Sequence, residues 1–348
     1  MTSVKEIDVQ TPAAAGRLGR ATFTFTDAYS VFDWGRMPDP IPDKGASLCT
    51  MGAFNFERLE AEGIATHYRG VVAAPGDEPV PLDAHDGPAR VMAIDLARVP
   101  DLPRAGGTYD YDAFHAAAGE AYVVPLEVIF RNRVPVGSSL RRRRRPDEVG
   151  LEAAEWPDES VGLPEPVVEF STKYERSDRY LDREEAQAIA GAADLEAIAS
   201  LARAVNRVVT DRAEARGFSH DDGKIEVVYH RGELLVADVV GTFDENRFTV
   251  DGQQVSKEVL RQYYKAYDPG WVDDLEAAKA EAKRLGEADW KARCASAPDP
   301  LPPAVVELAR DLYASGANRY LDEARFDAPA LSAVVERVRE TLADARAG

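Results

Sequence analysis

Two segments near the start of the chain alternate polar with apolar or β-branched residues, which predicts strands. They are residues 3–9 and 21–27, and a stretch rich in Ala and Gly separates them. From 46 to 63 the apolar residues recur at helical spacing, and Gly63 is typical of a residue that follows a helix. The sequence therefore predicts a β-hairpin followed by a helix.

The middle of the chain predicts further strands and a long helical region. Residues 70–116 carry many Pro, Gly and Asp between short apolar runs, which indicates strands joined by long loops. Residues 123–130 (VVPLEVIF) are dense in β-branched and aromatic residues and predict a buried strand. Residues 183–216 keep helical spacing up to Gly217, so one long helix or a kinked pair is expected.

A second hairpin and a helical tail are predicted after that. Residues 224–229 and 233–238 predict two strands joined through His230, Arg231 and Gly232. From 275 to the end the chain is charged and rich in Ala, with an interruption at 298–303, and predicts two or three helices.

Composition narrows the class of protein. No apolar stretch of the 348 residues approaches the ~20 that a membrane span needs, and the first ten residues show no secretion signal. The two cysteines, Cys49 and Cys294, lie far apart in the sequence, as suits a reducing compartment. We expect a soluble cytoplasmic protein with no membrane partner, built as one elaborate domain or two packed lobes.

The net charge of −19 argues against nucleic acid as a partner. A dispersed acidic surface would also suit concentrated salt, so a halophilic source is a hypothesis. The one basic island, residues 141–145, is either a solvated loop or helix edge or an anion-attracting rim. The sequence leaves the oligomeric state open, because an amphipathic helix looks the same within a chain and across an interface.

Three charged residues of the second hairpin form a candidate site. Lys224 and Glu226 lie two apart on one strand and so share a face, and Asp238 lies on the partner strand. The two carboxylates share a side only if the connection has an odd number of residues, and a three-residue loop containing Gly232 would satisfy this. Such a pair suits Mg²⁺ held together with substrate phosphates. The alternative is the ordinary charged open face of a strand pair.

A second candidate cluster follows the predicted buried strand. Arg131 and Arg133 precede Gly137, Ser138 and Ser139. Arginine forks, hydroxyl groups and exposed backbone N–H groups can cradle a phosphate or another oxyanion. An ordinary polar turn would show the same residues.

These residues also carry a family resemblance. The matching pieces are, in order, residues 26–33 (TDAYSVFD), 41–45 (IPDKG), 124–127 (VPLE) leading to Arg131 and Ser138, 171–173 (STK), 224–226 (KIE), 237–238 (AD), 244–247 (DENR) and 256–261 (SKEVLR). Across roughly residues 3–267 the chain resembles SAICAR synthetase, the phosphoribosylaminoimidazole-succinocarboxamide synthase family.

The resemblance implies an α+β fold of two lobes, similar to ATP-grasp or kinase-like proteins. A small β-rich, nucleotide-covering lobe would span residues 1–122, a larger α+β catalytic lobe 123–267, and a helical C-terminal extension packed on that lobe 268–348.

The resemblance also implies an ATP- and Mg²⁺-dependent ligase of purine biosynthesis. ATP would phosphorylate the carboxylate of carboxyaminoimidazole ribonucleotide, and the amine of L-aspartate would displace the phosphate. Lys224, Glu226 and Asp238 would be catalytic, with Glu226 and Asp238 holding the metal. ATP would bind Lys5, Arg17, Arg20 and Lys224. The small-molecule substrates would bind Ser30, Asp33, Lys44, Arg131, Ser138, Lys173, Asp182, Arg247, Lys257 and Arg261.

Several positions depart from the family pattern. Residues 2–5 (TSVK) replace a Gly-Lys start, and Arg17 and Arg20 are proposed to supply the missing charge. Ala28 stands where Arg is common, and Leu181 and Val239 replace the His of a His-Asp pair and a Glu. These departures leave alternatives open: a ligase of the same fold with another amine or nucleotide, a nucleotide-binding protein without ligase activity, or a structural protein.

Overall fold

The two opening strands pair with each other and begin an antiparallel sheet. The computed structural model describes residues 4–74, 76–105, 108–175, 178–287 and 289–347. In it β1 (Lys5–Thr11) pairs with β2 (Gly19–Phe25), and the sheet has the order β1-β2-β4-β3, with β3 at Tyr68–Val72 and β4 at Val91–Leu96. The predicted hairpin is confirmed.

One helix packs on this sheet. α1 (Lys44–Ala61) contacts β2, β3 and β4, and its apolar side buries Leu48, Phe56 and Leu59. Gly63, with φ 77°, follows its end, so the predicted stop is confirmed. The start lies two residues earlier than predicted.

The region from 70 to 116 contains the expected strands and one helix that was not predicted. Besides β3 and β4 it holds η1 (Leu82–Ala84) and a small two-stranded sheet of β5 (Arg104–Ala105) and β6 (Thr108–Tyr109). The additional helix, α2 (Tyr111–Ala118), begins where the Asp110 side chain accepts a hydrogen bond from the Ala113 backbone N–H.

The second sheet carries most of the candidate chemistry. Its main order is β13-β12-β10-β8-β9, and β7 and β11 pair with the far part of the long strand β10. The bounds are β7 Ala121–Val123, β8 Leu126–Val134, β9 Val161–Thr172, β10 Ser219–His230, β11 Glu233–Ala237, β12 Asn246–Val250 and β13 Gln253–Gln254. The predicted strand over 123–130 is interrupted after Val123, because Pro125 lacks a backbone donor.

The helical region after β9 is a pair of helices. α4 (Arg183–Ala190) ends at Gly191, whose φ of 69° turns the chain, and α5 (Leu195–Glu214) starts after Asp194. Side chains of Asp182 and Asp194 cap the two helix starts. Between β8 and β9 lie the short helices α3 (Leu140–Arg143) and η2 (Pro146–Val149).

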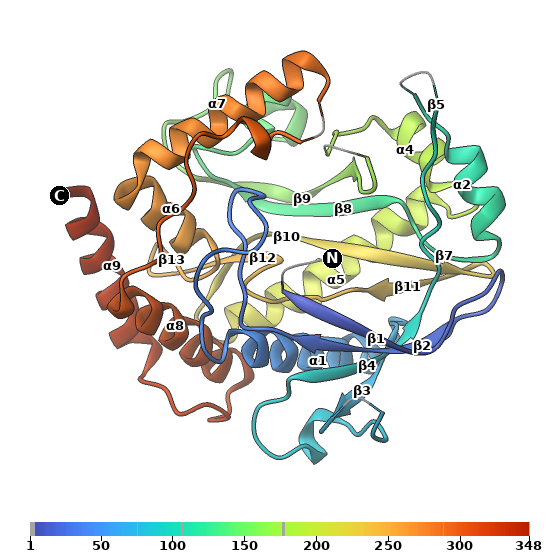
Figure 1. Cartoon of the computed structure of the whole chain (residues 1–348), viewed down its shortest axis with the longest axis horizontal. Coiled ribbons are helices and arrows are strands. Elements are labelled where there is room, and N and C mark those ends of the chain that lie inside the picture. Colours follow the sequence, from blue (N-terminus) through green and yellow to red (C-terminus); the bar gives the residue numbers. More distant parts are fainter. Residues whose placement is uncertain (1–3, 75, 106–107, 176–177, 288, 348) are drawn as a thin grey trace.

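The tail forms helices as predicted, and the helix before it, α6 (Glu258–Tyr267), was not predicted. The tail helices are α7 (Pro269–Leu285), η3 (Lys291–Arg293), α8 (Pro303–Leu321) and α9 (Leu331–Ala347). α8 packs against α1, while α9 packs against α8 and α6 (Figure 1). None of the described helices combines the length and apolar character that crossing a membrane requires.

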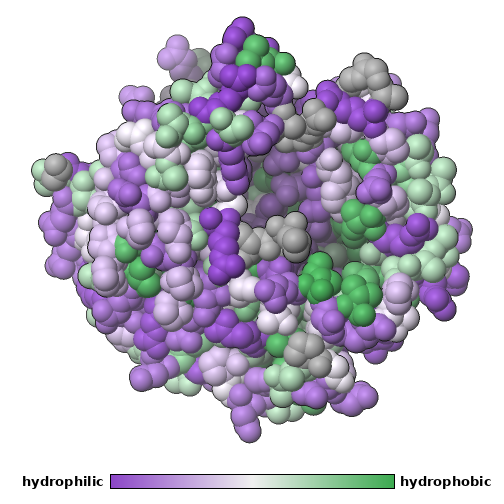
Figure 2. Space-filling model, in the orientation of Figure 1, coloured by the Kyte–Doolittle hydropathy of each residue, from purple (hydrophilic) through white to green (hydrophobic). Residues whose placement is uncertain are grey.

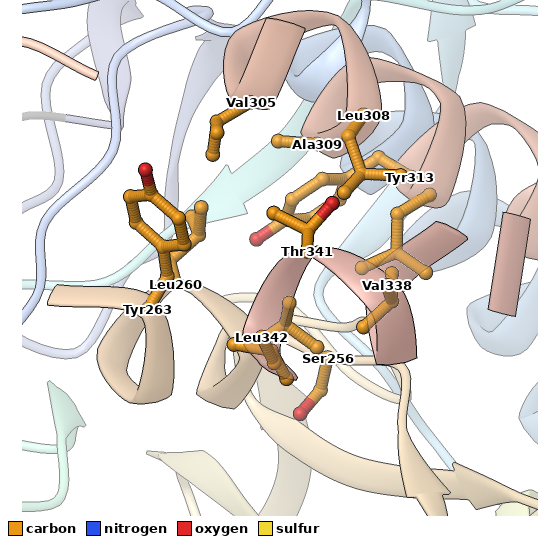
Figure 3. A pocket seen from close by; sticks show the side chains of 12 residues that line it. Ser256, Leu260, Tyr263, Val305, Leu308, Ala309, Tyr313, Val338, Thr341 and Leu342 are labelled. Carbon is orange, nitrogen blue, oxygen red and sulfur yellow. The ribbon is translucent and has the colours of Figure 1, made fainter. Parts of the chain in front are cut away.

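A small apolar cavity lies where these tail helices meet. Figure 3 shows side chains of Val305, Leu308, Val338 and Leu342 around it, and its volume is about 20 Å³. That volume is close to the space for one water molecule, and its walls offer no polar surface, so we place the functional site elsewhere.

Candidate active site

Glu226 and Asp238 come together by a different route from the one that the sequence predicted. His230 pairs with Glu233, so the hairpin loop has two residues, Arg231 and Gly232, and the predicted three-residue loop is wrong. Both have positive φ (52° and 91°), as in the turn whose twist matches paired strands. Glu226 pairs with Ala237, so strict alternation would point the Asp238 side chain to the other face of the sheet from Glu226. Asp238 instead follows the last residue of β11 and has a φ of 67°. This left-handed conformation breaks the alternation and turns its side chain towards Glu226.

The electrostatics of this pair show that the two carboxylates are close. Burial and the charge of Asp238 raise the pKa of Glu226 to about 7. The pKa of Asp238 moves down because, although burial opposes this, Lys5 forms an ion pair with it. Lys173 forms an ion pair with Glu226. The charges of two carboxylates and two lysines thus neutralise each other, and all four side chains are largely buried.

Lys224 lies on the same strand and faces a polar cavity. Its Nζ lies 2.9 Å from Glu127 Oε1 and 3.3 Å from Glu245 Oε2, and the nearby charge of Glu245 raises its pKa. The cavity beside it has a volume of about 200 Å³. Its cationic lining consists of Arg131, Lys224, Arg247, Lys257 and Arg261. Figure 2 shows a hollow in this face of the molecule with hydrophilic side chains inside it.

Two arginines of the cavity are held by buried carboxylates. Arg131 donates to Glu169 (2.8 Å), to Asp222 (3.1 Å) and to the Tyr180 hydroxyl (3.0 Å). Arg247 donates to both oxygens of Asp222, at 2.9 and 2.8 Å. Because each guanidinium is fixed by such bonds, the remaining donors point in defined directions, as anion recognition requires.

Comparison with known proteins identifies the family. The sequence profile of SAICAR synthetase matches residues 15–278. The chain belongs to the SAICAR synthetase family. A putative phosphoribosylaminoimidazole-succinocarboxamide synthase of Archaeoglobus fulgidus is 40% identical over 98% of this chain and 100% of its own length. The corresponding synthase of Thermoplasma acidophilum is 31% identical over 84% of this chain and 89% of its own.

Solved structures show the same fold at lower identity. A SAICAR synthase from Saccharomyces cerevisiae, complexed with SAICAR, aligns with a TM-score of 0.59 at 21% identity over 93% of this chain and 94% of its own. A SAICAR synthetase in complex with ADP aligns with a TM-score of 0.53 at 21% identity over 86% and 99%. The predicted family and α+β fold are confirmed, and so is the enzyme class, an ATP-dependent ligase of purine biosynthesis. The division into three parts at 122 and 267 stays a prediction.

The candidate site includes acidic residues that the sequence did not lead us to assign. Glu169 and Asp222 hold Arg131 and Arg247, and Glu127 and Glu245 hold Lys224. Glu127 belongs to one of the matching pieces of sequence, so that piece could have indicated it. Glu169 and Asp222 could not have been found, because their partners lie 38 and 25 residues or more away in the chain.

Asp178 is a further acidic residue of the site, and it contrasts with Asp182. Desolvation and the nearby charge of Glu127 raise the pKa of Asp178 to about 6, and Lys224 and Asp33 are also within electrostatic reach. Asp182 instead accepts from the Glu185 backbone N–H and caps α4. Asp178 therefore lies within electrostatic reach of Lys224, whereas Asp182 is occupied in capping α4. A role for Asp182 in substrate binding stays a prediction.

The remaining predicted residues fall into distinct places. Lys44 is fully buried, 2.8 Å from Asp244, which also accepts from Tyr313 (2.7 Å), so it lies behind the cavity wall. Ser138 is buried and accepts from the Leu140 backbone N–H. Ser30 accepts from the Gly35 backbone N–H. Their binding roles stay predictions.

The three cations of the first hairpin, Lys5, Arg17 and Arg20, have different surroundings. Lys5 reaches Asp238, whereas Arg20 lies 3.2 Å from Asp95 and Arg17 is exposed in the connection between β1 and β2. Thr2 and Ser3, which stand where the family has Gly-Lys, lie outside the described residues. The three apolar departures pack into the protein: Ala28 and Val239 are buried, and Leu181 is partly buried against the core.

The basic island at 141–145 is mostly exposed, but two of its arginines make specific contacts within the protein. The Arg141 guanidinium donates to the backbone oxygens of Pro135 and Val134 and stacks on Trp156. Arg143 forms an ion pair with Glu169 and lies 3.4 Å from the centre of the Tyr180 ring. Neither original reading covers the whole tract, because Arg143 supports Glu169 and through it Arg131.

The donor set at Glu226 and Asp238 fits Mg²⁺. Magnesium in phosphate sites is typically held by one or two carboxylates together with phosphate oxygens and water. The described residues contain no group of three or more His, Cys, Asp or Glu arranged to hold a metal alone. A carboxylate pair that depends on a phosphate to complete the coordination matches a metal that arrives with ATP.

Proposed function

We propose that the chain joins carboxyaminoimidazole ribonucleotide to L-aspartate, with ATP and Mg²⁺, to form SAICAR. The observation that carries the proposal is the convergence of Lys5, Lys173, Lys224, Glu226 and Asp238 beside a cavity lined by fixed arginines. The names of the relatives at 40% and 31% identity support the same substrates.

The reaction needs two steps, and the site offers groups for both. A substrate carboxylate oxygen attacks the γ-phosphorus of ATP and ADP leaves; the amine nitrogen then attacks the acyl carbon, phosphate leaves, and the amine loses a proton. Mg²⁺ held by Glu226 and Asp238 would neutralise charge on the ATP phosphates. Lys5, Lys173 and Lys224 would add positive charge there.

Arg131, Arg247 and Ser138 would bind the phosphate of the ribonucleotide. The two guanidinium groups share Asp222 and are therefore fixed relative to each other. A phosphate with its three oxygens accepts from such paired forks. The carboxylate and the amine on the imidazole ring of the ribonucleotide would then face Glu127 and Lys224 across the same cavity.

Asp178 would accept the proton from the attacking amine. A general base works best when its pKa lies near the working pH, and burial with a neighbouring carboxylate brings that of Asp178 to about 6. Its carboxylate is exposed and lies within electrostatic reach of Lys224, one of the proposed phosphate-transfer groups.

An ADP-release assay tests the proposal. Purified protein, Mg²⁺, ATP, carboxyaminoimidazole ribonucleotide and L-aspartate are expected to give turnover, and omission of any one substrate should abolish it. The assay is run at low and multimolar KCl, because the acid excess of 61 Asp and Glu over 42 Lys and Arg suits high salt. Folded protein that binds ATP but turns over at neither salt would contradict the substrate pair.

A same-fold ligase with a different amine or nucleotide is the second candidate. The observation in its favour is that Ala28 and Val239 are apolar and buried at positions where the family commonly has charged residues. Replacing L-aspartate by other amino acids in the same assay distinguishes the two, since faster turnover with another amine would support the second candidate.

A further inference from the structure

The loop after β2 holds an unusual backbone conformation at a predicted substrate residue. Phe32 and Asp33 have φ of 54° and 59°, and Gly35 follows with φ 85°. For residues other than glycine the left-handed region costs roughly 1–2 kcal/mol each. Two consecutive residues of this kind persist only where surrounding contacts hold them.

Those contacts come from the C-terminal helices. The Trp34 ring lies 5.5 Å from that of Trp271 on α7 and 5.9 Å from that of Trp290, next to η3. The Phe32 ring lies 5.8 Å from the Trp271 ring. Trp271 is almost fully buried, so the loop is anchored to the core of the tail and not to a mobile surface.

Two lysines of the same segment, Lys279 and Lys291, also contact the loop. Lys279 Nζ lies 2.8 Å from Asp33 Oδ2 and 5.1 Å from the centre of the Trp290 ring. Lys291 Nζ lies 5.5 Å from the centre of the Trp34 ring. In Figure 1 α7 lies across the top of the molecule, above the loop that joins β2 to α1.

The Asp33 side chain is 84% exposed and lies within electrostatic reach of two cations of the cavity. Desolvation alone would raise the pKa of Asp33, but the positive charges of Lys279, Arg261 and Lys257 outweigh it and lower that pKa. Arg261 and Lys257 line the cavity. A carboxylate surrounded by several cations is suited to a small ligand that carries one ammonium and two carboxylates, because both signs of charge find a partner.

We propose that Lys279 is a positioning residue that, with Trp271 and Trp290, holds Asp33 at the cavity rim to receive the ammonium group of the amino-acid substrate. Lys257 and Arg261 then receive its carboxylates. The profile of the family ends at residue 278, so Lys279 and Trp290 are contributions of this chain from beyond it. The inference rests on the proposed function in taking L-aspartate as that substrate.

Kinetics of matched lysine variants test the proposal. Lys279→Met keeps an apolar stem and removes the charge, and we expect the KM for L-aspartate to rise about fivefold, the size of a partly exposed ion pair. The kcat and the KM for ATP should stay within about twofold. Lys279→Arg should restore the KM. Lys283→Met, at an exposed position on the same helix, should leave it unchanged.

A double-mutant cycle separates positioning from general stabilisation. Asp33→Asn should raise the KM for L-aspartate, and adding Lys279→Met to it should raise the KM no further, because both act through one carboxylate. Additive effects, or a lowered melting temperature with an unchanged KM, would overturn the proposal.

Hydrogen exchange keeps the test independent of the substrate. Lys279→Met should speed amide exchange in residues 29–37 relative to the unaltered protein and to Lys283→Met, whatever the amine is. If the unaltered protein does not use L-aspartate, the proposed function fails while faster exchange still supports the clamp, the contacts by which Trp271, Trp290 and Lys279 hold the loop. Unchanged exchange overturns the clamp even if L-aspartate turnover is normal.

Discussion

At the scale of single residues, the site is a set of opposite charges that balance each other before any ligand binds. Lys5 and Lys173 neutralise Asp238 and Glu226, and Asp222 is shared by Arg131 and Arg247. A buried ion is costly unless paired, so these pairs keep the charges stable in the protein. When ATP and its metal bind, the lysines would turn to the phosphates and the carboxylates to the metal. No further charged side chain would then have to be desolvated.

The carboxylate pair gives the first residue-scale prediction. Glu226→Gln or Asp238→Asn should lower kcat by on the order of a hundredfold or more, because metal and phosphate lose a charged ligand. Glu233→Gln, at an exposed position of the same hairpin, is the matched control and should keep normal turnover. Steady-state rates with melting temperatures measure this, and near-normal kcat in both site variants would refute the site.

The two aspartates after β9 give a pH prediction. If Asp178 accepts the proton, kcat/KM should fall as pH drops below about 6, because protonation of its carboxyl removes the base. Asp178→Asn should lower kcat about a hundredfold and remove that limb of the profile.

Asp182→Asn supplies the comparison for that pH profile. It should leave the profile intact and cost about 1 kcal/mol of helix stability or less, since Asp182 caps α4. If Asp182 instead carries the role that the family resemblance implies, the two variants would exchange their effects on kcat.

At the scale of elements, strand β10 unites the two halves of the site. Its residues pair with β12 and β8 at one end and with β11 and β7 at the other. It therefore carries Asp222, which holds the two arginines, and Glu226, one of the two proposed metal ligands, on one continuous backbone. The stretch between them has little tolerance for change, because Gly223 lies against Asn246 and Phe130.

Gly223→Ala tests that close packing. A Cβ there would lie 2.0 Å from Asn246 Oδ1 and 2.6 Å from a ring carbon of Phe130, so strands must shift. We expect a loss of about 1–3 kcal/mol in the free energy of unfolding, together with weaker binding of both nucleotides. Gly270→Ala, where nothing lies within 4 Å, should be neutral or slightly stabilising. Denaturant unfolding of the two variants measures the difference.

At the scale of the whole molecule, the helical tail closes the structure around the site. Tyr313 of α8 donates to Asp244, Tyr320 donates to Asn55 on α1, and Trp271 of α7 anchors the loop that carries Asp33. Chain segments more than two hundred residues apart are thereby fixed to one another. Truncating the tail would remove support from the loop that carries Asp33 as well as from α1.

The charge of the whole molecule predicts its response to salt. At a net charge of −19 the compact state repels itself, and mobile ions screen this repulsion. The melting temperature should therefore rise by several degrees between 0.1 M and multimolar KCl, as seen by circular dichroism. A near-neutral protein scanned in the same buffers is the control, and an equal rise in both would contradict an effect of the acidic surface.

Local pattern determined much of this protein, because periodicity and turn residues act over short distances. The β1–β2 hairpin, α1, the α4–α5 pair, the second strand pair and the helical tail all follow from it, and the order of short motifs indicated the family. Lys224, Glu226 and Asp238 could be proposed as a site because three charges on one predicted hairpin are visible in the sequence.

Only the tertiary structure decided how those residues meet. The positive φ of Asp238, rather than an odd-numbered loop, brings it to Glu226. The ion pairs of Lys5, Arg131 and Lys279 join residues 233, 91 and 246 positions apart. Contacts over such separations depend on how sheets and helices pack, and no local pattern encodes them. For the same reason the electrostatic contact of Asp178 with Lys224 and the packing of Trp34 against Trp271 and Trp290 appear only in the folded chain.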